Sequence, residues 1–355
     1  MALEANIAMD FSTYLIRRLL LLIPVLIGVS ILIFAILQFF SPVERAMLFV
    51  HSPQQFGRID EIIEQYGLDD PIWKQYLTWI TQIFHGNFGW SQVVGMPTLK
   101  AIGTFLPATV ELAIFATPLI VLGGIYLGTK AAAHKDSFID HITRVVAIVG
   151  WSLPTFWLGL MLLMVFYGFF SGLFPPERLS TAMNAVVHSA EFTRYTGVNF
   201  LDGILNWQWN VTFDALRHLV LPVLTLTVVM IAFIMRLMRS SMLETLGKGY
   251  VLTARAKGLP ENIVINKHAR RNAMIPVLTI AGYLFASIVN GVVITESIFN
   301  YKGLGWWAWR AAVTLDIPSI LAFALFSGTL FVLTNLVVDL LYARFDPRVR
   351  LGASA

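Results

Sequence analysis

The chain contains no cysteine and few charged residues. Without thiols it can form neither a disulfide nor a Cys-type metal site, and thiol chemistry is excluded. Its seven histidines are scattered along the chain and predict no metal-ligand cluster. Charged residues make up only 13% of the chain, against about 25% in an average soluble domain, while 57% of its residues are hydrophobic. Water cannot cover such a surface, so a soluble fold is excluded.

Long apolar runs are what the sequence has instead. A membrane-spanning helix needs about 20 mainly apolar residues, and six stretches approach that length: 19–40, 108–127, 145–170, 219–235, 275–294 and 317–341. Four prolines fall inside these runs, where neighbouring helices of a membrane bundle can tolerate them; they are Pro24, Pro118, Pro154 and Pro222. We therefore expect an all-α polytopic membrane protein with six transmembrane helices.

The distribution of Lys and Arg predicts the orientation, because cytoplasmic loops carry an excess of both. With the N-terminus inside, 16 of the 25 basic residues lie on the inner side, and the even number of spans puts the C-terminus there too. Arg17-Arg18 before the first run is typical of a secretory signal, but the run is too long, so it is interpreted as a retained helix. The basic total follows the topology and does not indicate nucleic-acid binding.

The predicted spans divide the chain into four parts. Residues 1–40 form the N-terminal tail and first span, 41–106 an extracytoplasmic segment, 107–343 a core with five further spans and 344–355 a cytoplasmic tail. In the second part, Asp60 to Tyr66 and the stretch after Pro71 have helical periodicity. The second of these helices either lies at the membrane interface or belongs to a packed external cap. Segment 171–217 is assigned no structure, and 299–316 is expected to be a short re-entrant or capping loop.

The run from Gly123 to Lys130 superficially resembles a phosphate-binding loop. That motif requires Lys before Ser or Thr and a preceding strand, whereas here Thr129 precedes Lys130 at the end of an apolar helix. The chain is therefore expected to have no nucleotide site of its own.

Polar residues near membrane depth are candidates for a transport pathway or gate. They are Glu111 and Asn290, with Glu296 close to the outer end of the fifth span. Structural pairing of the acids, for instance with Arg217 or Arg310, is the favoured alternative to substrate contact. Asp339, near the inner end of the sixth span, belongs to the same class.

The inner connection 236–272 is long, basic and helical in its periodicity. Its centre, 250–258, carries small residues at Ala254, Ala256 and Gly258, and Leu259-Pro260 ends the helix. A short helix with small residues and a basic rim, outside the membrane, suits docking into a groove of another protein.

This centre, followed by His268 and by the run from Arg271 to Pro276, closely resembles the EAA loop of binding-protein-dependent ABC importer permeases. The version is that of the dipeptide, oligopeptide and nickel branch. Further stretches resemble the same branch in the same order: 66–71 with Gln75-Tyr76, 221–243, 339–342 and 346–348. Three residues depart from the family pattern: Thr253 replaces the first acid of the loop, Asn87 follows Gly86 where Asp is common, and Lys302 replaces a proline.

The resemblance implies a permease, with 107–343 as its core, that forms a translocation pathway with a homologous second permease. Two cytoplasmic ATPases, which hold the ATP and magnesium, would bind the coupling helices of the pair, and an extracytoplasmic binding protein would deliver substrate from outside the bacterial or archaeal cytoplasmic membrane. The chain itself would bind no cofactor and would not be an enzyme. The implied coupling residues are Thr253, Ala254, Arg255, Ala256, Lys257, Gly258 and His268. A bulky side chain at Gly258 is then expected to block docking.

Two other functions remain as alternatives. A secondary transporter or channel without ATPases would show inverted repeats and midplane charges, which the sequence does not show. A membrane-embedded enzyme would need a nucleophile, base or metal constellation, and none is found. Peptides are the substrate that the resemblance favours, but its branch also imports nickel complexes, glutathione and oligosaccharides.

Overall fold

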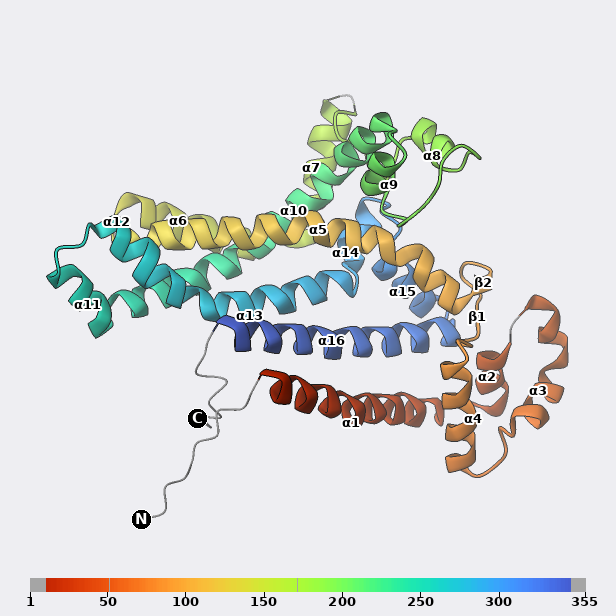
Figure 1. Ribbon diagram of the computed structural model, residues 1–355. Coiled ribbons are helices and arrows are strands. Elements are labelled where there is room, and N and C mark those ends of the chain that lie inside the picture. Colours follow the sequence, from red (N-terminus) through yellow and green to blue (C-terminus); the bar gives the residue numbers. More distant parts are fainter. Residues whose placement is uncertain (1–10, 51, 171, 346–355) are drawn as a thin grey trace, which may run out of the picture.

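The computed structural model describes residues 11–50, 52–170 and 172–345, and most of them are helical. Five long helices run side by side (Figure 1): α1 (Phe11–Leu37), α5 (Thr98–Ala133), α10 (Trp209–Leu246), α13 (Arg270–Val289) and α16 (Ile317–Phe345). Each contains a stretch long and apolar enough to cross a membrane. The predicted all-α polytopic architecture is thus confirmed. The two terminal tails, and with them the motif 346–348 and the side chain of Asp339, lie outside the described residues.

The third predicted span, 145–170, is not one helix. α6 (Phe138–Ser152) is followed by α7 (Thr155–Leu163) and the π-helix η3 (Met164–Phe169), and the two halves are bent by 94°. The break lies at Pro154: Leu153 before it is extended, with φ −74° and ψ 122°, as the ring of a following proline favours. The expectation that Pro154 sits inside a continuous span is therefore wrong. Pro24, Pro118 and Pro222 do lie inside unbroken helices.

The fifth predicted span ends earlier than expected. α13 ends at Val289, and Asn290 caps it before Gly291, whose φ of +106° leaves the helical region. The chain then starts α14 (Val293–Ile298), so the helix does not continue to residue 294.

α5 and α10 pack most closely in the centre of the bundle. A Cβ placed at Gly124 would lie 2.5 Å from Ile234, and one at Gly128 would lie 2.6 Å from the Met235 carbonyl oxygen. Only residues without a side chain permit this approach. Gly124 and Gly128, which belong to the run 123–130, therefore permit the close packing of two helices.

A cap, formed by the segment predicted to lie outside, covers one end of the bundle. It contains α2 (Pro42–Ala46), the 3-10 turns η1 (Met47–Phe49) and η2 (Pro53–Arg58), α3 (Ile59–Tyr66), α4 (Ile72–Phe84) and a hairpin of β1 (Trp90–Ser91) and β2 (Met96–Pro97). The two helices predicted near Asp60 and after Pro71 are confirmed as α3 and α4.

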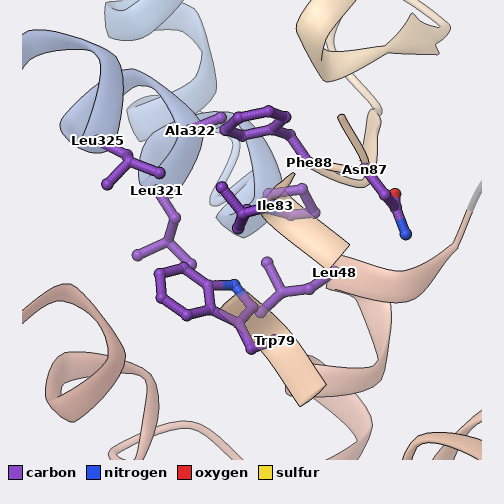
Figure 2. A pocket seen from close by; sticks show the side chains of 9 residues that line it. Leu48, Trp79, Ile83, Asn87, Phe88, Leu321, Ala322 and Leu325 are labelled. Carbon is purple, nitrogen blue, oxygen red and sulfur yellow. The ribbon is translucent and has the colours of Figure 1, made fainter. Parts of the chain in front are cut away.

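α4 crosses the end of α1 (Figure 1) and packs onto it. Trp79 is buried beside Phe34, and the hydroxyls of Tyr76 and Ser30 share a hydrogen bond of 2.8 Å. Figure 2 shows Trp79 and Ile83 facing Leu321 and Leu325 of α16. α4 is thus packed against α1 and α16 along one face, while Trp73 and Leu77 on it are 66% and 53% exposed.

The two remaining outer segments are helical as well. Segment 171–217 holds α8 (Thr181–Val187), α9 (Asn199–Leu205) and the first residues of α10, which begins ten residues before the predicted start at Leu219. Segment 299–316 contains α15 (Leu304–Val313).

At the opposite end of the bundle lie α11 (Gly249–Ala256), α12 (Glu261–Ile263) and the π-turn η4 (Val264–Ala269), which leads into α13 (Figure 1). The start of α1 and the end of α16 lie toward this end too.

Candidate functional site: the surface of α11 and the buried polar clusters

One face of α11 anchors it to the rest of the chain. Val251 is fully buried and Ala254 is only 6% exposed; both pack against Val264 of η4, with Leu246 of α10 beside them. Apolar contacts thus fix α11 to both α10 and the start of α13. Ala254, predicted as part of a docking face, contacts this chain's own core.

The other face of α11 is open. Thr253, Arg255 and Ala256 are exposed, as are Lys257 and Gly258 directly after the helix. The same surface carries two residues that the sequence reasoning did not single out, Tyr250 (45% exposed) and Leu252 (54% exposed). His268 is half-buried on η4. Tyr250 and Leu252 could not be singled out from the sequence, because an apolar side chain on a short amphipathic helix does not indicate which side of the helix faces out.

Ion pairs hold the loop around α11 in shape. Arg255 donates two hydrogen bonds to Glu261 at the start of α12, Nε to Oε2 at 3.1 Å and Nη2 to Oε1 at 2.6 Å. These bonds raise the pKa of the Arg255 guanidinium. Lys248 pairs with Glu244 at 2.8 Å, just before α11. Arg255 is therefore committed to this chain, whereas Lys257, the other cation of the predicted pair, forms no ion pair with any residue that the structure describes.

Gly258 ends the α11 turn with a φ of +76°, a conformation that L side chains rarely adopt. A Cβ at this position would meet no atom within 4 Å. Within this chain the glycine is thus required by the turn, and a tryptophan at Gly258 would strain the backbone whether or not a partner docks there.

A buried ion pair joins α6 to α10 toward the end of the bundle that carries α11. Asp140 is fully buried and accepts hydrogen bonds from Arg239, Nε at 2.7 Å and Nη2 at 2.8 Å, with Arg144 at 3.8 Å. It was not predicted, because the two residues lie 99 positions apart. The contact couples the helix that precedes the 94° bend to the helix that carries α11.

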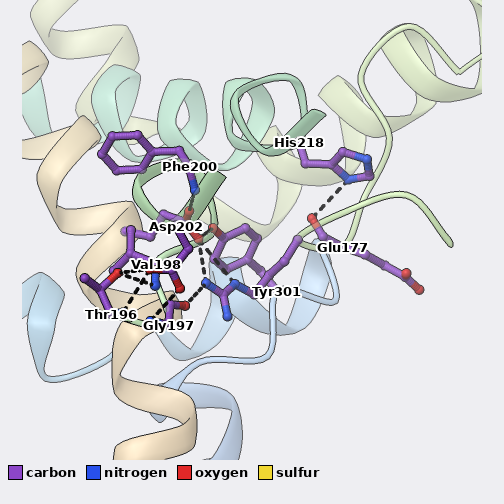
Figure 3. Close-up of polar contacts among 10 residues, drawn as sticks. Glu177, Thr196, Gly197, Val198, Phe200, Asp202, His218 and Tyr301 are labelled. Atoms are coloured by element: carbon purple, nitrogen blue, oxygen red, sulfur yellow. Dashed lines mark hydrogen bonds and ion pairs between the residues drawn. The ribbon is translucent and has the colours of Figure 1, made fainter. Parts of the chain in front are cut away.

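Glu111, near the outer part of α5, is the centre of a second cluster. Its buried carboxylate accepts hydrogen bonds from Arg178 (2.7 Å), from the Tyr301 hydroxyl (2.6 Å) and from the backbone N–H of Phe200 (3.1 Å). Burial raises the pKa of Tyr301, which keeps its hydroxyl protonated as a donor. Figure 3 shows Tyr301 beside the turn 196–202.

The favoured structural pairing of Glu111 is thus observed, but with a different cation. The cation that pairs with Glu111 is Arg178, and not Arg217 or Arg310 as suggested from the sequence. Arg217 instead donates to the carbonyls of Gly172 and Leu173. Arg178 also donates to the Gly197 carbonyl at 3.0 Å, so the cluster ties segment 172–208 to α5 and to the region before α15.

Glu296 lies in a separate pocket of donors. Its carboxylate accepts hydrogen bonds from the Thr109 hydroxyl and from the backbone N–H of Trp306, both at 2.7 Å. A Cβ on Gly303 would lie 2.6 Å from the carboxyl carbon, so the Gly303-Leu-Gly305 run closes around it. Burial raises the pKa of Glu296, although these hydrogen bonds lower it. Among the described residues no cation pairs with it.

Asn290 is the third pathway candidate. Its backbone N–H donates to Ala286, and its side-chain oxygen is buried without a hydrogen-bond partner in the described part of the chain. The next residue, Gly291, packs against the backbone of Gly305, which places Asn290 near the Glu296 pocket.

Comparison with known proteins shows the family. Residues 120–351 match the family described as "Binding-protein-dependent transport system inner membrane component", and residues 11–110 match the corresponding N-terminal family. The probable D,D-dipeptide transport system permease protein DdpB of Escherichia coli is 38% identical over 97% of this chain and 99% of its own. The dipeptide permease DppB of Alkalihalophilus pseudofirmus (37%) and the oligopeptide permease AppB of Bacillus subtilis (36%) each match over 95% of this chain and 99% of their own. The resemblance seen in the sequence is thereby confirmed, and the chain belongs to the family of binding-protein-dependent transport system inner membrane components.

Proposed function

We propose that this chain is one permease subunit of an ATP-driven importer of di- or oligopeptides in a bacterial or archaeal cytoplasmic membrane. The observation that carries the proposal is α11, a short helix fixed on one face to α10 and η4 and open on the other. The relatives named above, whose names describe dipeptide and oligopeptide transport, support the substrate class.

The proposed complex has five subunits. A homologous second permease completes the pathway, two ATPases bind ATP and magnesium and dock on the coupling helices, and a binding protein delivers the peptide from outside. In this arrangement the bent pair α6–α7 counts as a sixth span, and both termini are cytoplasmic. The chain itself hydrolyses nothing.

The contacts of α11 suggest how ATPase motion reaches the membrane. Val251 and Ala254 connect α11 to η4, and η4 runs directly into α13. At its other end, α11 directly follows α10 in the chain. The Arg239–Asp140 ion pair connects α10 to α6 in turn. A displacement of α11 would therefore move three membrane helices together, which is what alternation between inward-open and outward-open states requires.

The test is a single substitution on the open face of α11. Leu252→Glu places a charge on a side chain that is 54% exposed, so folding should be unaffected while an apolar docking contact is lost. Leu315→Glu, at an exposed outer position, is the matched control. We expect the ATPases to co-purify with the control and not with L252E, and ATP-dependent peptide uptake in proteoliposomes to be lost with them.

Two results would contradict the proposal. L252E that retains both ATPase binding and uptake would show that α11 is not the coupling surface. Uptake by the permeases without ATPases, driven by an ion gradient, would indicate a secondary transporter. Competition of labelled peptide uptake by unlabelled oligosaccharide, glutathione or a nickel complex identifies the substrate class.

A further inference from the structure

Beyond its first three residues, the polar side chains of α13 lie on a single face. Between Ala273 and Val289 its hydroxyl-bearing residues are Thr279, Tyr283 and Ser287, and every other side chain there is apolar or absent. Their spacing of four residues places them above one another on a helix, and Asn290 follows three residues later on the same face. We call these four residues the α13 stripe.

The stripe lies at membrane depth. Arg271 marks the inner end of α13, and Tyr283 lies 12 residues beyond it, about 18 Å along a helix that rises 1.5 Å per residue. In a hydrocarbon core about 30 Å thick, Tyr283 is therefore near the middle.

A hollow of about 310 Å³ lies beside the stripe. Tyr283 and Ser287 line it from α13, with Ile280 and Leu284; Met230 and Phe233 line it from α10, and Trp151 from α6. Trp151 precedes the 94° break at Pro154 by three residues. None of these described lining residues carries a charge, and the Arg236 guanidinium lies 5.0 Å from the Trp151 ring.

Lipid is a poor occupant of this face. Tyr283 is 38% exposed, Ser287 is exposed, and neither hydroxyl has a hydrogen-bond partner within the described residues. An unpaired polar group facing hydrocarbon is unfavourable, whereas one facing water or a polar ligand is not. Tight packing by a partner helix is disfavoured too, because such interfaces use small residues, and Trp151, Phe233 and Tyr283 are bulky.

We propose that the α13 stripe and this hollow form this chain's wall of the translocation pathway, over which the peptide in transit passes. This inference rests on the proposed function. The hydroxyls can exchange hydrogen bonds with any peptide backbone, and the uncharged apolar lining accepts varied side chains. A fixed charge in the wall would hold one peptide terminus and oppose release, so its absence from the lining suits a route that must not bind tightly.

The experiment uses the natural absence of cysteine from this chain. Ser287→Cys is almost isosteric, and Phe285→Cys, on the opposite side of α13 and 40% exposed, is the matched control. Both variants are assembled into the full transporter, with partner subunits free of reactive cysteine, in proteoliposomes. They are treated with a water-soluble thiol reagent, methanethiosulfonate ethylsulfonate, with and without ATP, binding protein and peptide.

We expect the thiol of S287C to react at least about tenfold faster than the thiol of F285C, because the reactive thiolate forms only where water reaches it. Turnover with ATP and peptide should change the rate at position 287, and the modification should abolish uptake. Labelling of S287C only by a lipid-soluble maleimide, or equal reaction rates for S287C and F285C, would overturn the inference.

Uptake measured before labelling separates the two proposals. If unmodified S287C shows ATP-dependent peptide uptake but its thiol does not react, the pathway assignment alone fails. If neither wild type nor variant shows ATP-dependent peptide uptake, the proposed function fails, and the pathway assignment with it.

Discussion

Arg239 of α10 and Asp140 of α6 form a two-point ion pair, with N–O distances of 2.7 and 2.8 Å, around a carboxylate that is fully buried. Asp140 lies in the first turn of α6, and Arg239 directly follows Met238, which packs on Gly128 of α5. The pair therefore fixes the inner end of α6 against the central helix.

Arg239→Ala should destabilise the protein, because it leaves the Asp140 carboxylate buried and without its main partner. Loss of one partner of a buried pair costs about 3–5 kcal/mol, and we expect the lower end because Arg144 remains 3.8 Å away. The double variant Asp140→Asn with Arg239→Gln, which removes both charges, should recover part of the loss. Thermal unfolding of the purified complex measures this, and equal melting temperatures for R239A and wild type would contradict it.

Gly128→Ala should weaken the contact between α5 and α10. The new methyl group would lie 2.6 Å from a backbone oxygen of Met235, which cannot rotate away. Overpacking of this kind costs about 1–3 kcal/mol. Gly28→Ala in α1 is the matched control, because a Cβ there meets nothing within 4 Å. A melting temperature lowered by G128A and unchanged or slightly raised by G28A is expected; equal effects would show that the helices separate easily.

The spans were predictable from the sequence because a long apolar run is a local signal. The prolines show what this local signal cannot predict, namely whether a helix continues through a proline or breaks there. Pro118 and Pro222 lie in continuous helices while Pro154 ends one, and the sequence around them gives no means of separating the two outcomes. The difference depends on whether neighbouring helices satisfy the freed backbone groups, which is a tertiary property.

The polar clusters were only partly predictable for a related reason. Glu111 was recognised as a buried acid in need of a partner, but Arg178 lies 67 residues away in a segment with no assigned structure. Glu296 was singled out, yet nothing in its spacing from the Gly303-Leu-Gly305 run indicated that these glycines enclose the carboxyl group. The position of α11 was predicted from the motif, while the direction of Ala254 depends on how η4 folds back onto it.

Arg178→Ala should loosen the outer segment without unfolding the bundle. The guanidinium links Glu111 to the Gly197 carbonyl, so its removal weakens the link between the turn 196–202 and α5, which the bond from the Phe200 N–H to Glu111 then carries. We expect faster hydrogen exchange of the Phe200 amide and its neighbours, while amides in the middle of α10 are unchanged. Arg310→Ala, at an exposed position on α15, is the control. Equal exchange in R178A and wild type would show that the hydrophobic contacts of α9 alone hold the segment.

The buried carboxyl of Glu296 predicts a specific dependence of stability on pH. Burial raises its pKa above 4.5, so over the interval between 4.5 and the folded value the folded state holds a proton that the unfolded chain has lost. Stability contributed by this group is then fully present below pH 4.5 and falls as pH rises through that interval. Glu296→Gln cannot ionise and lacks this dependence. The melting temperature of wild type minus that of E296Q should therefore be largest at low pH and shrink toward neutral pH, measured by thermal unfolding in detergent. A difference that grows with pH would mean that the Thr109 hydroxyl and the Trp306 N–H outweigh burial and stabilise the carboxylate form.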